Sequence, residues 1–397
     1  MGGSTFQHIL SQLIHNQEIP LTNQNINVSH LESFELHFQK IPLHFSFHIS
    51  GQEKPQYESI IIRLTDSKGN IGLGESAPFG YLTKDDIPLA RVEMESLLNH
   101  FKGKNILFIL QNLDRFWTRR ELRSVTAVSA LQQGLMDLLC KGFGAKLWEA
   151  YRAWSVWEKA PSPSYPVLGL PTDVTLPLID PSLVSEFMEM GESLKVPYYK
   201  IKVGGNQSED LDRIEFFMEN NVRGVPFSLD GNQGFSASSA THFLEKLNHF
   251  GWSPLFFEQP LPENDISGLE SLSHQWKTPI CVDESVTSVV EAQNLKSRFP
   301  LRMINLKHMK SSLLEMIRVA RWSYLNGISL MIGGMMESEI GMTHSLHFAY
   351  GTGWITWLDL DTPFFLKNFI TLENPWKARS AHLEVPHPKG LGLSLDF

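Results

Sequence analysis

The sequence predicts an α/β protein: a (β/α)8 barrel with an N-terminal α+β capping domain. Eight short apolar runs recur after Pro161 at intervals of about 25 residues, and stretches with helical periodicity separate them. Alternation of this kind is typical of parallel βα units, and eight units favour a closed barrel over an open doubly wound sheet. The first run is not followed by a glycine-rich phosphate-binding turn, which disfavours the open sheet further.

The chain before the barrel divides into two parts. Residues 1–33 form an N-terminal extension, either a short helix or a disordered arm followed by a polar linker, whose role the sequence does not indicate. Residues 34–160 form the α+β capping domain, because alternating apolar positions with a hairpin turn at residues 67–70 precede a helical pattern between residues 124 and 151.

The barrel is assigned to residues 161–362, and residues 363–397 form a C-terminal segment that we expect to pack back on the capping domain. In such barrels the catalytic side chains stand at the carboxyl ends of the strands, so the candidate site is sought there. The eight expected strands lie near residues 174, 198, 225, 254, 279, 301, 328 and 354.

Composition limits the partners of the chain. Its 397 residues are 42% hydrophobic and 19% charged, and the net charge of −9 leaves no basic surface for nucleic acid. No apolar run reaches the length of a membrane span, and the first residues lack the cationic start and apolar core of a secretory signal. Cys140 and Cys281 are expected to be buried thiols, which suits a cytoplasmic protein. The expected partner is a small-molecule substrate, and a homo-oligomer is compatible with the sequence.

Acidic side chains follow three consecutive strands. Asp230 ends the third, Glu258 ends the fourth, and Asp283 with Glu284 ends the fifth. The spacings, 28 residues from 230 to 258 and 25 residues from 258 to 283, each correspond to one βα unit, so the carboxylates should converge. Converging carboxylates repel one another unless a cation lies among them, and an all-oxygen site suits Mg²⁺.

Lysines flank these acids. Lys200 and Lys202 are two residues apart in the second strand and therefore point to the same side, while Lys307 ends the sixth strand and faces them across the barrel axis. A carbon held between Lys202 and Lys307 can exchange a proton on either face. The charge of Lys200 should lower the pKa of Lys202 and make it a better base near neutral pH. The alternative is that Lys200 and Lys202 simply pair with nearby acids.

Two further acids, Asp359 and Asp361, end the eighth strand and point the same way. Because they lie beyond the expected metal ligands, they indicate a site for a cationic group of the substrate, such as an ammonium. The alternative is a helix N-cap before the Thr-Pro pair. Glu337, after the seventh strand, is expected either to support a catalytic lysine or to cap a helix.

Several motifs resemble the enolase superfamily, in its muconate-lactonizing-enzyme-like subgroup. Asp359-Leu360-Asp361 resembles the DxD signature of the dipeptide epimerases of that subgroup, and residues 71–83 resemble part of its capping domain. The resemblance spans about residues 34–370. The remaining motifs are KIK (200–202), DGNQG (230–234), FEQP (257–260), VDES (282–285), NLK (305–307) and GGMMES (333–338).

This resemblance implies an isomerase: a Mg²⁺-dependent dipeptide epimerase that removes and returns the substrate's α-proton through an enediolate intermediate. The alternative on the same site is an o-succinylbenzoate synthase or a muconate-type cycloisomerase, neither of which needs the DxD pair. The implied residues are Lys202 and Lys307 as the acid–base pair, Asp230, Glu258 and Asp283 as metal ligands, Asp359 and Asp361 as ammonium ligands, and Lys200, Asn232, Glu284 and Glu337 as supporting groups.

Two departures from the family pattern bear on the substrate. Ser311 and Ser312 stand where the family usually has glycines, and residues 41–56 lack the arginine with which Ala-Glu epimerases bind a second carboxylate. The same loop carries Phe45 and Phe47, so we expect an apolar second residue in the dipeptide. A binding or scaffold protein is a third hypothesis, disfavoured by the complete set of acids and lysines.

Overall fold

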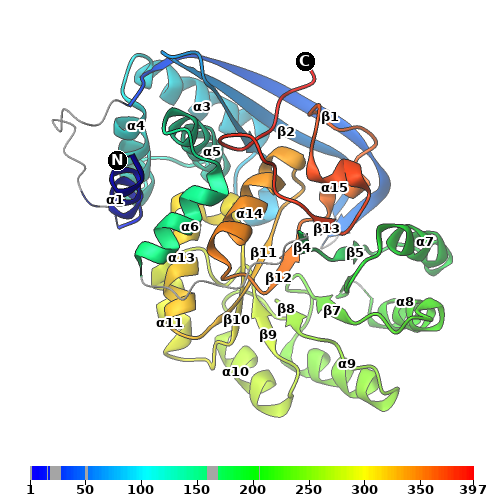
Figure 1. Ribbon diagram of the computed structural model, residues 1–397. Coiled ribbons are helices and arrows are strands. Elements are labelled where there is room, and N and C mark those ends of the chain that lie inside the picture. Colours follow the sequence, from blue (N-terminus) through cyan, green and yellow to red (C-terminus); the bar gives the residue numbers. More distant parts are fainter. Residues whose placement is uncertain (1, 16, 18–27, 50–51, 159–168, 205) are drawn as a thin grey trace.

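The chain forms an N-terminal sheet-and-helix unit seated on one end of a barrel (Figure 1). The two units share one continuous hydrophobic core. The structure, a computed structural model, describes residues 2–15, 17, 28–49, 52–158, 169–204 and 206–397.

The N-terminal unit is an antiparallel three-stranded meander covered by helices. The hairpin turn predicted at residues 67–70 joins its second and third strands, as expected. Its strands are β1 (Leu31–Ile49), β2 (Gln52–Asp66) and β3 (Ile71–Ser76). Its helices are α2 (Gly80–Thr83), α3 (Ile87–Phe101), α4 (Ile106–Thr118), α5 (Val125–Gly142) and α6 (Leu147–Trp157).

Helix α5 lies at the centre of this unit, and every residue from Val125 to Cys140 is buried. It packs directly on β3, where a Cβ atom added to Gly72 would lie 2.2 Å from the carbonyl oxygen of Gly134. The glycines therefore allow the helix and the strand to meet backbone to backbone. The opposite side of α5 contacts the barrel.

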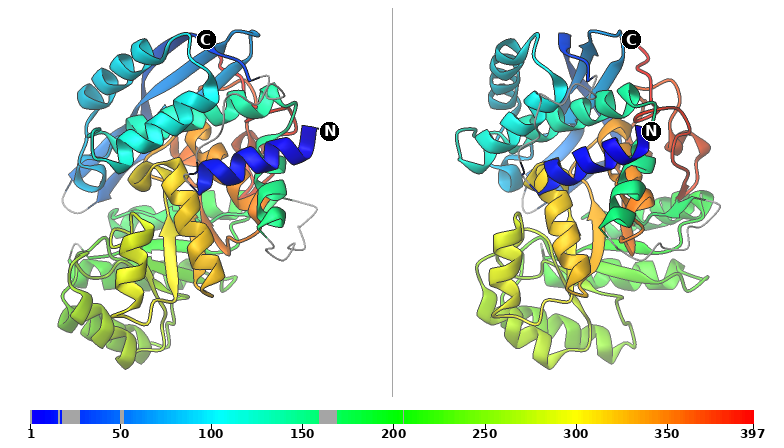
Figure 2. Two further views of the ribbon diagram at one scale, coloured as in Figure 1. Left: turned by 90° about the vertical axis from the view of Figure 1, so that its left-hand side faces the viewer. Right: turned by 60° about the vertical axis from the view of Figure 1, so that its left-hand side comes forward.

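The N-terminal extension contains a helix, α1 (Gly2–Ile14), which lies at the junction of the two units (Figure 2). Its apolar side chains are buried against α6 and against α13 of the barrel. Arg318 on α13 donates to the carbonyl oxygen of Ile14 at 2.7 Å and pairs with Asp114 on α4 at 2.5 Å. One partly buried arginine thus joins the first helix to both units.

The barrel has eight parallel strands, and each lies in one of the eight predicted apolar runs, which confirms the fold class. Helices alternate with the strands, and the α-helix that follows the last strand, α15, has four residues. The strands are β5 (Val174–Leu176), β6 (Tyr199–Lys202), β7 (Phe227–Asp230), β8 (Phe257–Glu258), β9 (Ile280–Val282), β10 (Met303–Leu306), β11 (Ser329–Gly333) and β12 (Trp357–Asp359). The helices are α7 (Val184–Leu194), α8 (Gln207–Asn220), α9 (Ala237–His249), α10 (Ile266–Gln275), α11 (Val289–Lys296), α12 (His308–Ser311), α13 (Leu313–Leu325), α14 (Glu339–Thr352) and α15 (Thr362–Phe365).

The sheet has a seam between its first and last strands, β5 and β12, which do not pair in a regular ladder. Isolated bonds close it instead. The Asp173 amide donates to the carbonyl oxygen of Leu358 at 3.0 Å, and the Thr175 amide donates to the Asp361 carboxylate at 2.6 Å. The carboxylate of Asp361, a predicted site residue, therefore accepts a bond from β5 that a backbone carbonyl oxygen would accept in a regular sheet.

The C-terminal segment returns to the N-terminal unit. Leu366 forms a bridge with Leu43 on β1, and the Leu391 amide donates to Asp137 on α5 at 2.7 Å. Four short elements complete the chain: β4 (Leu170–Pro171), β13 (His382–Leu383), and the 3₁₀ helices η1 (Pro181–Leu183) and η2 (Pro375–Ala378).

Cys140 and Cys281 are both free and buried. Among the described residues, no helix combines the length and the apolar character that crossing a bilayer would require.

Candidate active site

The predicted metal-binding carboxylates lie at the mouth of the barrel. Asp230 ends β7 and Glu258 ends β8, and the two are direct partners in the parallel register. Asp283 follows β9, two residues beyond Cys281, which is the register partner of Glu258. All three acids are at most 1% exposed.

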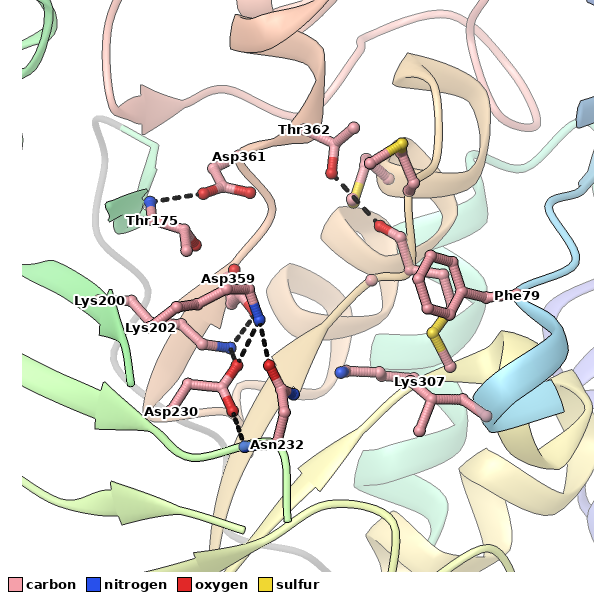
Figure 3. A pocket seen from close by; sticks show the side chains of 15 residues that line it. Phe79, Thr175, Lys200, Lys202, Asp230, Asn232, Lys307, Asp359, Asp361 and Thr362 are labelled. Atoms are coloured by element: carbon pink, nitrogen blue, oxygen red, sulfur yellow. Dashed lines mark hydrogen bonds and ion pairs between the residues drawn. The ribbon is translucent and has the colours of Figure 1, made fainter. Parts of the chain in front are cut away.

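Lysine ammonium groups lie among these carboxylates. Nζ of Lys200 is 3.1 Å from Asp230 and 2.9 Å from Glu258. Nζ of Lys202 is 2.9 Å from Asp230, and Nζ of Lys307 is 2.5 Å from Asp283. Lys200 and Lys202 do pair with acids, as the alternative interpretation required, but their partners are predicted site residues. Figure 3 shows Lys202 and Lys307 reaching toward the cavity from opposite sides.

The backbone after two of these acids is strained. Asn232 and Gln233 follow Asp230 with φ angles of 39° and 66°, and Gln259 follows Glu258 with φ of 28°. Non-glycine residues in this region cost about 1–3 kcal/mol each and cluster at functional sites. The strained turn directs Asn232 inward, where its Oδ1 accepts a hydrogen bond from Lys202 at 2.6 Å.

Negative charge exceeds positive charge in the site. Burial raises the pKa of Glu258 to about 7; Lys200 opposes this shift, and the charges of Asp230 and Asp283 add to it. A surplus of buried carboxylate oxygens is a donor set that fits a hard divalent cation such as Mg²⁺. The site holds seven buried acids and four buried lysines: Asp173, Asp230, Glu258, Asp283, Glu284, Asp359, Asp361, Lys200, Lys202, Lys307 and Lys310.

Asp359 and Asp361 lie at the end of β12 and are 7% and 4% exposed. Asp359 accepts a hydrogen bond from Lys200 at 2.9 Å, and Asp361 is held by the Thr175 amide (Figure 3). Asp361 occupies the N-cap position of α15, but its side chain makes no capping hydrogen bond. The alternative interpretation as a helix cap is therefore wrong.

A set of three acids at the seam has carboxylate oxygens that all lie within 4.8 Å of one another: Asp173, Asp359 and Asp361. In the part of the chain that the structure describes, Asp230, Glu258 and Asp283 do not form such a set. Their carboxylates are joined to lysine ammonium groups instead.

The wall of the cavity opposite the acids is apolar. Phe79 and Leu82 come from the N-terminal unit, in and beside α2, while Met335, Met336 and Met342 come from the loop after β11 and from α14. Phe79 and Met335 pack together with Leu82 in a small cluster over the mouth. The predicted residues Phe45 and Phe47 lie outside the described side chains.

Glu337 belongs to a buried network beside Lys307. Its Oε1 accepts from the Met335 amide at 2.8 Å, and its Oε2 lies 3.1 Å from Nε2 of His308, the residue after Lys307. Burial lowers the pKa of His308, but the charge of Glu337 and the hydrogen bonds to Glu337 and to the Gly341 carbonyl together outweigh this and leave it above its ordinary value. Glu337 thus contacts His308, and Ser338 takes the capping position of α14.

Glu75 of β3 continues this network from the N-terminal unit. Its carboxylate accepts from the Tyr57 hydroxyl at 2.7 Å, from the Ser338 amide at 2.9 Å, from the Ser338 hydroxyl at 2.6 Å and from the Gly341 amide at 2.9 Å. The acid therefore fastens the N-terminal unit to the start of α14, the helix that contributes Met342 to the cavity wall.

Sequence reasoning missed three polar residues of the site. Lys310 donates to Asp283 at 2.6 Å, and Asn305 donates to Glu258 at 2.7 Å. Asn305 could have been found, because it precedes Lys307 by two residues on the same strand and therefore shares its face. Asp173 precedes its strand and belongs to none of the recognised motifs.

Ser312, one of the two departures from the family pattern, has φ of 71°. This is the left-handed region that favours glycine. Its hydroxyl accepts from the Glu315 amide at 3.4 Å at the start of α13, so the serine supplies a helix cap at a position whose backbone suits glycine.

Comparison with known proteins agrees with this geometry. A sequence model of the family described as "Enolase C-terminal domain-like" matches residues 183–397, which is more than half of the chain. The chain belongs to this family, which confirms the resemblance drawn from the motifs.

Its curated relatives are isomerases, as the predicted enzyme class requires. A hydrophobic dipeptide epimerase from Citrifermentans bemidjiense is 29% identical over 364 residues, 90% of this chain and 95% of the relative. An L-Ala-D/L-Glu epimerase from Bacillus subtilis is 26% identical, over 85% of this chain and 89% of the relative. A crystal structure of a dipeptide epimerase from Enterococcus faecalis, complexed with Mg and the dipeptide L-Leu-L-Tyr, shares the fold with a TM-score of 0.80, at 24% identity over 92% of this chain and 99% of that one.

Proposed function

We propose that this chain is a Mg²⁺-dependent dipeptide epimerase in which Lys202 and Lys307 exchange the α-proton of the second residue. The observation that carries the proposal is that these two lysines face one buried cavity from opposite sides, beside the acidic pair Asp359 and Asp361. An epimerase needs this arrangement, because one base must remove the proton from one face and a second group must return it to the other.

The metal would be held by Asp230, Glu258 and Asp283. When bound, Mg²⁺ would neutralise the negative charge that grows on the substrate carboxylate as the α-proton leaves. Lys200 pairs with Asp230, Glu258 and Asp359 at 2.9–3.1 Å and so balances charge between the metal ligands and the ammonium site. Glu284 lies beside Asp283, and burial together with the Asp283 charge raises its pKa to about 8.

Protein groups hold the lysines ready for proton transfer. Lys202 is oriented by Asp230 and Asn232, and Lys307 by Asp283. Burial lowers the pKa of Lys307, but the charges of Asp283 and Glu258 together outweigh this and raise it above its ordinary value. A cation bound by Asp283 would draw on the same carboxylate and so make Lys307 a better base.

We propose an apolar dipeptide as substrate. The wall formed by Phe79, Leu82 and three methionines offers no charged partner to an acidic side chain. The relative from Citrifermentans bemidjiense, a hydrophobic dipeptide epimerase, supports this choice. The buried free thiols also suit an enzyme of the cytoplasm.

The test uses Lys202→Met and Lys307→Met, assayed by α-proton exchange in D₂O with Mg²⁺ on both epimers of an apolar dipeptide. Each variant should lose epimerisation by more than about 100-fold, the scale of one acid–base group. Each should also retain exchange on only one epimer, and the two variants should retain opposite ones. Lys246→Met, on the exposed face of α9, is the control. Unchanged epimerisation in both variants would contradict the mechanism.

The alternative reactions of the subgroup are separated by Asp359→Asn and Asp361→Asn. An epimerase should lose dipeptide turnover in both variants, because the substrate's ammonium group loses its partners. A succinylbenzoate synthase or muconate-type cycloisomerase activity would persist, since those substrates carry no ammonium group.

A further inference from the structure

Asp173 is a buried acid without a role in the motifs or in the proton transfer above. It precedes β5 and is 0% exposed, and neither of its carboxylate oxygens has a hydrogen-bond partner among the described residues. A buried carboxylate without a partner is costly, so its presence calls for an explanation.

The fold places Asp173 against the ammonium site. Thr175 lines the cavity, and Asp173 lies two residues earlier, so both side chains face the inside of the barrel. The bond from the Asp173 amide to Leu358 fixes this position across the seam, next to Asp359 and Asp361.

The geometry of the three acids suits one small cation. Their oxygens lie within 4.8 Å of one another, so there is a point that lies no more than about 2.8 Å from each of them. That distance is the usual length of a charge-assisted N–H···O bond. A primary ammonium group carries three N–H donors, one for each carboxylate.

The charges of the cluster agree with this geometry. Burial raises the pKa of Asp173 well above its ordinary value, the charges of Asp359 and Asp361 raise it further, and Lys200 opposes them. Lys200 also serves Asp230 and Glu258, so its single charge leaves the cluster short of positive charge. Another cation would balance the excess negative charge of the three acids, and the distances between their oxygens leave space for it.

We propose that Asp173 is the third carboxylate of the ammonium site, and that the three acids together select substrates with a free primary ammonium group. The inference rests on the proposed dipeptide epimerase function. A dipeptide with a free N-terminus presents three N–H donors and one positive charge to the cluster. An N-acylated dipeptide presents one amide N–H and no charge.

The experiment compares the wild type with Asp173→Asn, which keeps the shape of the side chain and removes its charge. Asp180→Asn is the matched control, because it removes the same charge from an exposed position seven residues further along the chain. Exchange kinetics are measured in D₂O with a free apolar dipeptide and with its N-acetyl derivative. Melting without substrate and calorimetric titration with MgCl₂ complete the set.

We expect KM for the free dipeptide to rise about 10- to 100-fold in Asp173→Asn, the loss of one charge-assisted interaction, with kcat changed less than about 3-fold. Turnover of the N-acetyl dipeptide should not change. Without substrate, Asp173→Asn should melt at a temperature no lower than that of the wild type, because the amide, unlike the acid, cannot ionise beside Asp359 and Asp361.

Three results would overturn the inference. The first is an unchanged KM for the free dipeptide. The second is an equal loss on both dipeptides together with a lower melting temperature, which would show a structural role. The third is a second equivalent of Mg²⁺ bound by the wild type and absent from Asp173→Asn, which would assign the cluster to a metal ion. A wild type that exchanges no dipeptide at all would refute the proposed function itself.

A measurement on the wild type alone covers the case in which Asp173→Asn does not fold. A short primary alkylammonium ion should inhibit exchange competitively, and its trimethylated counterpart should inhibit at least about 10-fold less, because it has no N–H donors. Equal inhibition by the two ions, or none by either, would contradict a three-carboxylate ammonium site.

Discussion

Replacing Gly341 by alanine probes the junction between the N-terminal unit and the barrel with a single methyl group. Gly341 lies in the first turn of α14, and its amide donates to Glu75 at 2.9 Å. A Cβ atom at this position would lie 2.3 Å from Oε2 of Glu337 and 3.1 Å from Oε2 of Glu75. Glu337 would have to move, and with it its contacts to Met335 and His308.

The magnitude follows from these distances. Overpacking of a buried site costs about 1–3 kcal/mol, and weakening one buried hydrogen bond to a charged group costs about 1.5–3 kcal/mol. The higher helix propensity of alanine offsets about 0.5–1 kcal/mol of this cost relative to glycine. We therefore expect Gly341→Ala to lower the free energy of unfolding by about 2–4 kcal/mol.

Urea unfolding followed by tryptophan fluorescence measures this change, and Gly142→Ala is the control. Gly142 ends α5, is exposed, and has no heavy atom within 4 Å of an added Cβ atom. The control should be neutral or gain up to about 1 kcal/mol. Gly341→Ala should also raise KM for an apolar dipeptide, because Glu337 holds the Met335 amide of the cavity wall. A Gly341→Ala protein that unfolds and turns over like the control would refute the close packing inferred here.

Three further predictions concern pH, the first helix and the metal. Burial, with the charge of Glu337, raises the pKa of Glu75 from 4.5 to about 7. Protonation of Glu75 therefore stabilises the folded state fully below pH 4.5, and this stabilisation is lost as the pH rises through 7. Urea unfolding at pH 4.5 and at pH 8 measures how the free energy of unfolding depends on pH. Glu75→Gln should reduce the difference between the two values by up to about 3 kcal/mol, and an unchanged difference would contradict the pKa shift. Arg318→Ala should lower the free energy of unfolding by about 3–5 kcal/mol, because it leaves Asp114 buried and unpaired. Amide hydrogen exchange should increase most in α1, and an equal increase throughout the chain would contradict a role of Arg318 in holding α1. EDTA should abolish α-proton exchange and Mg²⁺ should restore it, and full activity in EDTA would exclude the proposed metal.

Much of the barrel could be predicted because its physical signals are local. Each apolar run is a strand buried on both faces, and each acid or lysine after a run marks the carboxyl end of that strand. The spacing of Asp230, Glu258 and Asp283 therefore placed them in one region, and the opposite positions of Lys202 and Lys307 followed from counting strands.

The rest depends on contacts that the local sequence does not encode. Asp173 acquires its surroundings only when β5 meets β12 at the seam, where Thr175 contacts Asp361, 186 residues further along the chain. The sequence allowed two roles for Glu337 and did not indicate its contact with His308. This contact depends on the path of the chain between β11 and α14. The apolar face of the N-terminal extension could not be assigned a partner from the sequence, because its contacts are with α6 and α13, which lie far away along the chain.

The backbone-to-backbone contact of Gly72 with Gly134 has an evolutionary consequence. A Cβ atom added to Gly72 would meet both the Gly134 carbonyl and the side chain of Leu138, so a larger residue there would push β3 and α5 apart and shift α5 against the barrel. The N-terminal unit is thus divided into two halves. The α5–β3 layer, whose helix contacts α12 directly after Lys307, is expected to vary little, whereas the segment around Phe79, which lines the cavity, is expected to be adaptable. Laboratory evolution toward new dipeptides should therefore accumulate changes around Phe79 and Leu82 while the two glycines persist.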